Sequence, residues 1–548
     1  METMGSMQAS ADVARPTIDD ARAVLSQHFG YQEFRPGQEA IIQAALSGRD
    51  SFAVMPTGSG KSVCYQVPAA LLGGLTIVVS PLISLMADQV RALKEAGIRG
   101  SFYNSTLKPR VRPEVLRRAL AGWYDIMYVA PERLTDPSFM EFAAQANIVL
   151  VAVDEAHCVS QWGQDFRPAY RAIAGFVNAL PVRPPVMALT ATATNRVRVD
   201  IANLLALRNP VMQVTGFDRP NLRFATLELT PKQREKWLAN YLRAHPGDSG
   251  IVYAPTRKKV EQLAEDLRGL GVAATAYHAG MSDAARDEAQ RAFVNDDALV
   301  LVATTAFGMG IDKSNVRFVV NCGLPLSLEE YYQEAGRAGR DGEPADCYLL
   351  WSKGDIRTCH FFIDNIEAEG LSGQDRERVI AGKERLLGEM IGYAMSTSCL
   401  RKRILRYFGQ DVTAFYDGCG HCSVCDGETA DRYLVKERKA AKAAKPAKSE
   451  RLSKRAGALP TSRVRSLREE DDFPVHDDDD ELFERLRSLR KELADLQGVP
   501  PYVIFSDATL RGMVRRRPKT AEELLEVSGV GQVKLERYGK AFLDELDA

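Results

Sequence analysis

Long apolar runs are missing from this sequence. No stretch approaches the roughly 18 apolar residues that a membrane-spanning helix needs, so we expect no transmembrane segment. The first residues, METMGSMQASADVARP, hold neither an apolar core nor a basic leader, so we expect no export signal and a cytoplasmic protein. A surplus of positive charge is also missing, since the net charge is −1. This argues only weakly against nucleic-acid binding, because one basic groove can bind DNA on a neutral protein.

Cysteines are few and unevenly placed. Of the nine, five are scattered and four lie close together, at Cys399, Cys419, Cys422 and Cys425. In a large chain without an export signal, clustered cysteines indicate metal ligands rather than disulfides. Four thiolates suit a closed, tetrahedral Zn²⁺ site that stabilises the fold, and an iron–sulfur cluster is the less favoured alternative. His421 is a weaker candidate ligand between two of the cysteines.

The length of 548 residues predicts three or four domains. From Ile18 to about Trp351, short β-branched runs alternate with helical stretches, as in buried parallel sheets. This stretch is too long for one sheet, so we expect two α/β domains in tandem. The predicted boundaries are 1–16 for a flexible N-terminus, 17–215 and 216–352 for the two α/β domains, 353–427 for a helical cysteine-rich domain, 428–477 for a flexible charged linker and 478–548 for an all-helical domain.

A glycine-rich turn, Pro-Thr-Gly-Ser-Gly-Lys-Ser, follows the first predicted strand. Lys61 in this turn would reach the β- and γ-phosphates of ATP, and the Ser62 hydroxyl would hold Mg²⁺. The usual P-loop pattern begins with glycine, and this chain has Met55 there. Backbone N–H groups that wrap the phosphates are expected at Thr57, Gly58, Ser59 and Gly60.

Two acidic residues follow the apolar run 148–153. Asp154 at the strand end can hold Mg²⁺ through water, and Glu155 can orient and polarise the attacking water. Paired acids after a strand are often only a solvated helix start. Their place downstream of a P-loop favours the catalytic interpretation.

The segment 333–342 carries two arginines three residues apart, Arg337 and Arg340, on a glycine-bearing stretch. Such arginines suit an arginine finger, which stabilises transition-state charge. A solvated arginine pair is the alternative. A finger from the second α/β domain that reaches ATP on the first would couple hydrolysis to closure of the cleft.

These motifs, in this order, resemble those of the RecQ family of superfamily 2 DNA helicases. The resemblance covers about residues 18–425 and again 478–548, and implies two RecA-like domains, a zinc-binding domain and an HRDC domain. The matching segments are 34–38, the adenine-reading segment; 55–62, motif I, Met55 included; 80–89, motif Ia; 154–157, motif II; 189–194, motif III; 304–312, motif V; and 333–340, motif VI.

The resemblance implies further contacts. Gln38 matches the adenine contact, and Arg35 precedes it in the same segment. By the same resemblance, Ser80 and Thr304 would contact DNA. The other residues that the resemblance places at ATP are Gly310, Asp312 and Gln333.

The segment 157–168 resembles the aromatic-rich loop that senses single-stranded DNA in this family. Trp162 and Phe166 can stack on bases regardless of sequence, and Arg167 can meet phosphate or stack. The alternative is that both aromatics belong to the core, and their polar neighbours argue against full burial. Gln164 stands where the family leads us to expect histidine.

The C-terminal stretch 481–548 resembles an HRDC domain, which would bind either single-stranded DNA or a protein. RecQ proteins usually place a winged-helix domain between the zinc site and this module, and its hairpin is thought to open the duplex. Only residues 426–480 stand there in this chain, too short and too polar for that fold. We therefore expect no winged helix, which puts the strand-separating wedge in doubt.

The motifs together predict an ATP-dependent 3′→5′ DNA helicase that acts in DNA repair and recombination, with ATP, Mg²⁺ and Zn²⁺. Its expected substrates are single-stranded and tailed or forked duplex DNA. Single-stranded-DNA-binding and recombination proteins are candidate partners of what we expect to be a monomer, cytoplasmic and nucleoid-associated in a bacterium. Two alternatives stay open: a DNA-stimulated ATPase, translocase or annealing protein with weak unwinding, and an RNA helicase.

Overall fold

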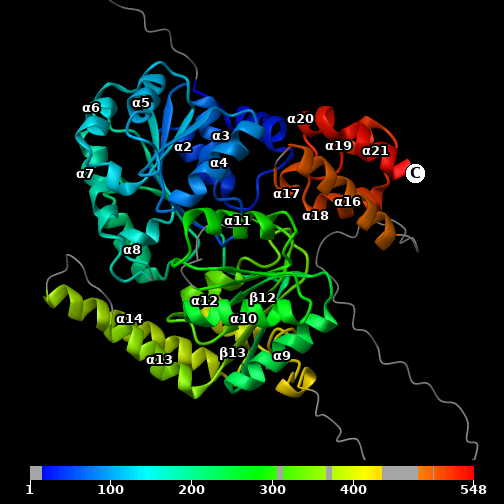
Figure 1. Ribbon diagram of the computed structural model, residues 1–548. Coiled ribbons are helices and arrows are strands. Elements are labelled where there is room, and N and C mark those ends of the chain that lie inside the picture. The colour runs from blue at the N-terminus through cyan, green and yellow to red at the C-terminus, as the bar shows by residue number, and fades with distance from the viewer. Residues whose placement is uncertain are drawn as a thin grey trace, which may run out of the picture.

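The computed structural model describes residues 15–163, 165–304, 313–365, 373–434, 479–497 and 499–547. Two lobes, each a parallel sheet between helices, lie next to each other, with a helical arm on the second lobe and a separate helical domain beside both (Figure 1). Gly310, Asp312, Gln164, residues 1–14 of the predicted flexible N-terminus and residues 435–477 of the predicted charged linker lie outside the described residues. The predicted linker begins at residue 428, but residues 428–434 pack on the second lobe, where Glu428 pairs with Arg223 and the Tyr433 ring contacts Trp237. Within the described part, every helix is too short or too polar to cross a bilayer.

The first lobe is built on seven parallel strands in the order β3-β4-β2-β5-β6-β1-β7. The residues of the central strands β2 and β5 are almost all buried, on both faces of the sheet, as a helix-covered parallel sheet requires, whereas the edge strand β7 is partly exposed. Val54 of β1 pairs with Thr190 of β6, and Val79 of β2 pairs with Val153 of β5, so these strands end at one edge. The strands are β1 (Ser51–Val54), β2 (Leu75–Val79), β3 (Gly100–Tyr103), β4 (Ile126–Val129), β5 (Ile148–Val153), β6 (Val186–Thr190) and β7 (Val211–Val214).

Helices cover both faces of this sheet (Figure 1). The first helix begins with a capping box, in which the Thr17 side chain accepts from the Asp20 backbone N–H and the Asp20 side chain accepts from the Thr17 backbone N–H. The α-helices are α1 (Ile18–Val24), α2 (Gln38–Leu46), α3 (Val63–Leu71), α4 (Ile83–Glu95), α5 (Arg112–Leu120), α6 (Pro137–Gln145), α7 (Ala172–Ala179) and α8 (Asn195–Leu204). Shorter turns are the π-helix η1 (Leu25–Phe29) and the 3₁₀-helices η2 (Pro131–Arg133), η3 (Ala156–Val159) and η4 (Pro168–Arg171).

The second lobe has six parallel strands in the order β10-β11-β9-β12-β13-β8. They are β8 (Leu222–Glu228), β9 (Ser249–Tyr253), β10 (Ala274–Tyr277), β11 (Val300–Ala303), β12 (Val316–Cys322) and β13 (Ala345–Trp351). Its helices are α9 (Pro231–Ala244), α10 (Arg257–Gly269), α11 (Asp283–Val294) and α12 (Leu328–Ala335).

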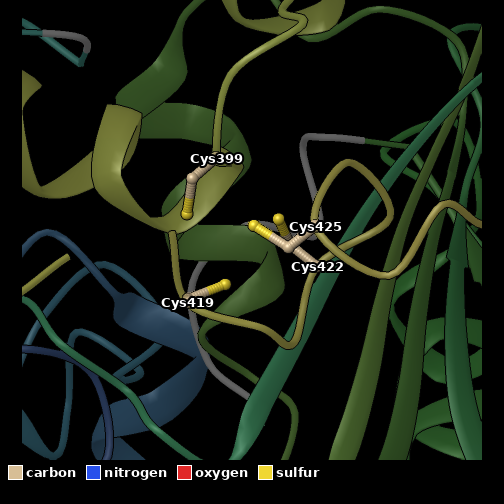
Figure 2. A group of neighbouring side chains, drawn as sticks. All are labelled: Cys399, Cys419, Cys422 and Cys425. Atoms are coloured by element: carbon tan, nitrogen blue, oxygen red, sulfur yellow. The ribbon is translucent and has the colours of Figure 1, made fainter. Parts of the chain in front are cut away.

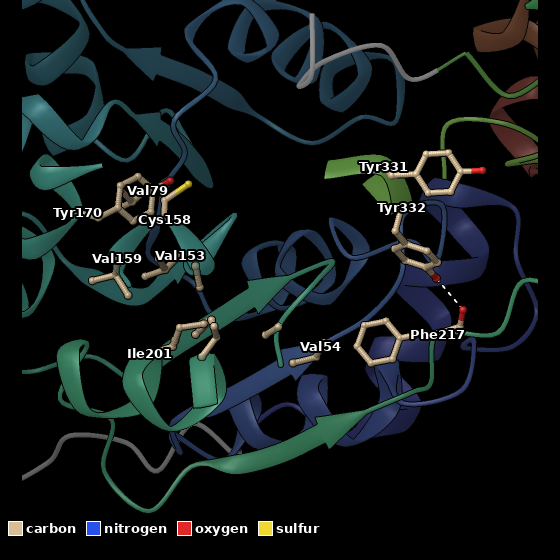
Figure 3. Close-up of a cluster of buried hydrophobic side chains, with 14 of the residues drawn as sticks. Val54, Val79, Val153, Cys158, Val159, Tyr170, Ile201, Phe217, Tyr331 and Tyr332 are labelled. Atoms are coloured by element: carbon tan, nitrogen blue, oxygen red, sulfur yellow. Dashed lines mark hydrogen bonds between the residues drawn. The ribbon is translucent and has the colours of Figure 1, made fainter. Parts of the chain in front are cut away.

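Phe217, in the segment that joins the lobes, lies in a hydrophobic core that both lobes share (Figure 3). Its ring stacks on Phe408 with the ring centres 4.3 Å apart, and its carbonyl accepts a hydrogen bond of 2.7 Å from the Tyr332 hydroxyl. The lobes are therefore joined by packing as well as by the chain.

The cysteine-rich module packs on the edge of the second sheet. The backbone of Cys422 forms an isolated parallel β-bridge with Phe224 of β8, and the Ser423 N–H donates to the Phe224 carbonyl at 3.0 Å. This pairing covers an otherwise open sheet edge. The helices of the module are α13 (Lys353–Asp364), α14 (Gly373–Ala394) and α15 (Leu400–Tyr407), with 3₁₀-turns η6 (Thr413–Phe415) and η7 (Ala430–Arg432).

The C-terminal domain has its own hydrophobic core and touches both lobes. On the first lobe, Arg537 pairs with Glu95 at 2.6 Å, and on the second, Lys491 pairs with Asp297 at 2.9 Å. Its helices are α16 (Asp479–Gln497), α17 (Pro501–Ile504), α18 (Asp507–Arg516), α19 (Ala521–Leu525), α20 (Gln532–Lys534), the π-helix η8 (Leu535–Gly539) and α21 (Lys540–Asp547). The predicted architecture of two parallel-sheet domains, a helical cysteine-rich domain and an all-helical domain is thus confirmed.

Candidate nucleotide, DNA and metal sites

The P-loop, residues 55–62, turns tightly between β1 and α3. Gly58 and Gly60 both have φ near +79°, a region that L side chains rarely adopt, so glycine is required at both positions. The Lys61 ammonium donates to the Met55 carbonyl at 3.3 Å, so the side chain lies back over its own loop. Burial lowers the pKa of Lys61, and the nearby carboxylates of Asp154 and Glu155 oppose that shift. The loop and its lysine form a cradle with the chemistry that phosphate needs.

The predicted adenine-reading residues lie against this loop. The Gln38 amide donates to the carbonyls of Ser59 at 3.1 Å and Gly60 at 2.9 Å, and its own oxygen accepts from the Arg35 N–H at 2.8 Å. The Arg35 guanidinium donates to the Gly58 carbonyl. The glutamine is buried, so its side chain supports the shape of the loop through these hydrogen bonds.

Asp154 and Glu155 follow β5 at the same sheet edge. Burial raises the pKa of Asp154, and the adjacent Glu155 charge raises it further. Burial alone would raise the pKa of Glu155 too, but His157 and the Lys61 charge lower it instead. Glu155 has φ of 46°, a left-handed conformation that is strained for glutamate and typical of functional positions. His157 Nδ1 lies 2.8 Å from the Thr190 hydroxyl, which joins motif II to motif III.

Motif VI of the second lobe lies directly on the P-loop. The Thr57 hydroxyl donates to the Gly336 carbonyl at 2.9 Å, and a Cβ placed on Gly58 would be 3.3 Å from Cγ of Arg340. Arg337 is buried on the same segment, and its charge helps to lower the pKa of Glu155 in motif II. The predicted finger residues are therefore brought to the phosphate cradle. Gln333, in turn, donates to the Thr192 hydroxyl of motif III at 3.1 Å.

The aromatic loop is covered by arginines. Trp162 and Phe166 are both partly exposed, and Arg171 lies over the Phe166 ring at 5.1 Å. Arg167 donates to Asp165 at 3.1 Å and to the Pro81 carbonyl at 3.1 Å, which connects the loop to motif Ia. Neither aromatic is fully buried, so both retain surface on which a base could stack.

The other predicted DNA contacts are less accessible. Ser80 and Thr304 are buried, and each stands directly after a strand, β2 and β11 respectively. The structure therefore places both at the carboxyl edges of the sheets but not on an open surface.

The four cysteines converge on one point (Figure 2). Their sulfurs all lie within 4.8 Å of one another, close enough to share one metal ion. Backbone N–H groups point at the sulfurs, from Leu400 to Cys422 at 3.4 Å and from His421 to Cys419 at 3.4 Å, and such donors stabilise thiolates. A Cβ on Gly418 would lie 2.7 Å from the Cys425 sulfur, so glycine is needed there. The donor set fits a closed Zn²⁺ site.

Two arginines at the site could not be found by sequence reasoning. Arg219 bridges the P-loop and motif VI, and Arg401 of α15 is buried against the segment between the lobes. Both make bonds to backbone carbonyls more than 100 residues away. The sequence carries no local pattern for such contacts.

Two RecA-like lobes with nucleotide motifs at their shared boundary define a helicase-type motor. Four protein families match the chain in succession. These are the DEAD/DEAH box helicase family over residues 35–200, the helicase conserved C-terminal domain over 233–342, the RecQ zinc-binding family over 353–426 and the HRDC domain over 479–546.

Bacterial relatives match almost from end to end. ATP-dependent DNA helicase RecQ of Bacillus subtilis is 38% identical, over 96% of this chain and 98% of the relative. The Haemophilus influenzae protein of the same name is 37% identical, over 97% of this chain and 96% of the relative. This chain belongs to the RecQ family of ATP-dependent DNA helicases, as its motifs predict, and neither the RNA-helicase alternative nor the weakly unwinding ATPase or annealing alternative is favoured.

The Bacillus alignment spans 594 positions, more than the 548 residues of this chain. The relative therefore has residues for which this chain has no counterpart. Among solved structures, the helicase MrfA bound to DNA is 19% identical with a TM-score of 0.51, over 67% of this chain and 54% of that one, and shares the fold.

Proposed function

We propose that this protein is a 3′→5′ DNA translocase and helicase whose two lobes close on ATP and reopen on hydrolysis. The observation that carries the proposal is the hydrogen bond between Thr57 of the P-loop and Gly336 of motif VI. Because the two halves of the nucleotide site come from different lobes, nucleotide bound there changes how the lobes meet. The direction of movement follows from the family.

The proposed chemistry divides among residues on both lobes. Lys61 neutralises the β- and γ-phosphates, Glu155 orients and polarises the attacking water, and Arg337 and Arg340 stabilise the charge that develops in the transition state. Positioning and charge neutralisation supply most of the catalysis in phosphoryl transfer. The remaining proposed ATP contacts are Arg35, Gln38, Thr57, Gly58, Ser59, Gly60, Gly310, Asp312 and Gln333.

Mg²⁺ would be held by the Ser62 hydroxyl and, through water, by Asp154. Both residues stand at the carboxyl edge of the first sheet, one after β1 and one after β5. A divalent ion there neutralises phosphate charge and favours the ionised Asp154, whose burial otherwise favours the neutral acid.

DNA contacts are proposed at Trp162, Phe166 and Arg167, with Ser80 and Thr304 reached from the sheet edges. The aromatic loop begins directly after motif II, so a base stacked there can alter the position of Glu155. We further propose a monomeric, cytoplasmic and nucleoid-associated bacterial protein that acts in DNA repair and recombination. Its proposed partners are single-stranded-DNA-binding and recombination proteins.

The proposal is tested by strand displacement with ATP on a duplex carrying a 3′ tail and a matched duplex carrying a 5′ tail. Wild type is expected to open only the 3′-tailed duplex, and Lys61→Ala neither. If neither duplex opens while single-stranded DNA still stimulates ATP hydrolysis, the protein is a translocase or annealing protein.

A further inference from the structure

One arginine between the lobes touches both halves of the ATP site. Arg219 lies after β7, the last strand of the first lobe, and before β8, the first strand of the second. Its Nη1 donates to the Thr57 carbonyl of the P-loop at 2.9 Å. Its Nη2 donates to the motif VI carbonyls of Ala338 at 3.0 Å and Gly339 at 2.8 Å. One planar group therefore ties the P-loop to the segment that carries both candidate finger arginines.

The acceptors of these hydrogen bonds are uncharged, as is the Asn221 amide oxygen that accepts from Nε at 3.4 Å. Burial lowers the pKa of Arg219, and the charges of Arg340 and Arg35 lower it further. All three arginines approach Gly58, where an added Cβ would lie 3.6 Å from Nη1 of Arg219. Carbonyl dipoles hold the group without cancelling its charge, so the region stays positive and suits phosphate oxygens.

The backbone of this segment is itself fixed from a third direction. Arg401 of α15 in the cysteine-rich module donates through Nη2 to the carbonyls of Arg219 at 2.8 Å, Pro220 at 3.1 Å and Leu222 at 2.8 Å. Cys399 caps the first turn of that helix. The backbone from which the Arg219 side chain projects is therefore held in place by the cysteine-rich module.

We propose that Arg219 is a positioning residue for ATP hydrolysis, an inference that rests on the proposed roles of Lys61 and Arg340. It holds motif VI at the separation from the P-loop at which the finger arginines meet the γ-phosphate. Arg219 acts through these residues, so its loss disturbs the transition state more than ATP binding.

The test uses the full chain with Arg219→Ala and Arg219→Lys. We measure DNA-stimulated ATP hydrolysis over a range of ATP concentrations, binding of a fluorescent ATP analogue, and the melting temperature. A displacement of about 1 Å can cost about 100-fold in rate, so Arg219→Ala is expected to lower kcat by about 100-fold with KM changed less than about threefold. Lysine, which keeps the charge but not the planar fork, is expected to recover part of kcat.

Arg234→Ala is the control. Arg234 is buried in the second lobe, and its guanidinium joins α9 to α13 by donating to the Leu229 carbonyl at 3.1 Å and to the Asp355 carboxylate at 3.3 Å. Those acceptors lie outside the P-loop, motif III and motif VI. Arg234→Ala is expected to lower the melting temperature like Arg219→Ala and to keep most of kcat. An equal loss of kcat in both variants, or a raised KM with unchanged kcat in Arg219→Ala, overturns the proposal.

A combined variant separates this inference from the proposed function. If Arg219 acts through the two finger arginines of motif VI, Arg219→Ala added to Arg337→Ala and Arg340→Ala hydrolyses ATP no more slowly than the variant with the two finger substitutions alone. Additive losses overturn the positioning role and leave the helicase proposal standing. Absence of DNA-stimulated hydrolysis in wild type overturns the proposed function itself, before any variant is compared.

Discussion

The guanidinium carbon of Arg196 lies 3.5 Å from the centre of the Trp162 ring. Arg196 belongs to α8 of the first lobe, and Arg385 of α14 approaches the same ring at 5.6 Å. The loop tryptophan thus meets cations from two domains. A base that stacks on this ring would replace at least part of these contacts, so we expect DNA binding and the position of α14 to be coupled.

Trp162→Ala is expected to weaken single-stranded DNA binding about tenfold, because stacking of one base on an aromatic ring contributes about 1–3 kcal/mol. ATP hydrolysis without DNA should stay close to wild type, while its stimulation by DNA is largely lost. The measurement is fluorescence anisotropy with a labelled oligonucleotide beside an ATPase titration. Trp123→Ala serves as control, since Trp123 is exposed and also has an arginine, Arg118, over its ring at 5.0 Å. Equal effects of the two substitutions would argue against a special role of the loop.

Removal of the metal is expected to unfold the cysteine-rich module. Without an ion, the four thiolates would repel one another. Cys422 also holds the module on β8 through its backbone β-bridge to Phe224, so displacement of this cysteine would loosen that contact. A strong chelator should release about one Zn²⁺ per chain and expose residues 399–425 to protease. Cys422→Ser should lose zinc in the same assay, whereas Cys322→Ser, outside the cluster, should keep it. Unchanged protease resistance after complete zinc removal would contradict this prediction.

Asp50 is expected to make the first lobe sensitive to acid. Its carboxylate accepts hydrogen bonds from Arg183 at 2.7 Å and from the N–H groups of Val186 at 2.8 Å and Arg208 at 2.6 Å. Burial by itself raises the pKa of Asp50, but these donors lower it overall. Because the folded pKa is depressed, the stabilisation is present above the unfolded value of about 3.9 and is lost as pH falls through the folded pKa.

Asp50→Asn should therefore destabilise the first lobe by about 3 kcal/mol at pH 7, and the difference from wild type should shrink below about pH 4. Thermal melts at several pH values check this. Glu114→Gln is the control, because Glu114 is paired with arginines on the exposed surface and should change the melts little. If the melting temperatures of wild type and Asp50→Asn changed with pH in the same way, the depressed pKa of Asp50 would not be the source of the acid sensitivity.

Contact of the HRDC domain with the first lobe can be tested by charge reversal. Arg537→Glu should weaken docking by placing two carboxylates together at Glu95, and Glu95→Arg in the same chain should restore it. The ion pair is partly exposed, so the expected change is about 0.5 kcal/mol and should diminish at high salt. Small-angle scattering at low and high salt measures the docked fraction. If the docked fraction of the double reversal equals that of Arg537→Glu alone, the ion pair between residues 95 and 537 does not contribute to docking.

The nucleotide and metal motifs are local, and this made them predictable. Residues 51–62 contain a strand, a glycine turn and a lysine within a dozen positions, and the two glycines fall where positive φ is required. The cysteines Cys419, Cys422 and Cys425 are likewise close in sequence, Cys399 precedes them, and the structure brings together all four that the sequence predicted. Short spacing restricts geometry, so residue type and order are enough to indicate the chemistry.

By itself, then, the sequence determined the two parallel sheets, the order of the motifs and the family, because strand periodicity and turn chemistry act over a few residues. Only the tertiary structure decided that Arg219 joins the P-loop to motif VI, that Arg401 binds the backbone from which Arg219 projects, and that Trp162 lies beneath arginines from two domains. Those contacts join residues more than 100 positions apart, except for the short step from Trp162 to Arg196. Their formation depends on how whole lobes pack, and an isolated arginine in a sequence looks the same whether it is solvated or buried against distant carbonyls.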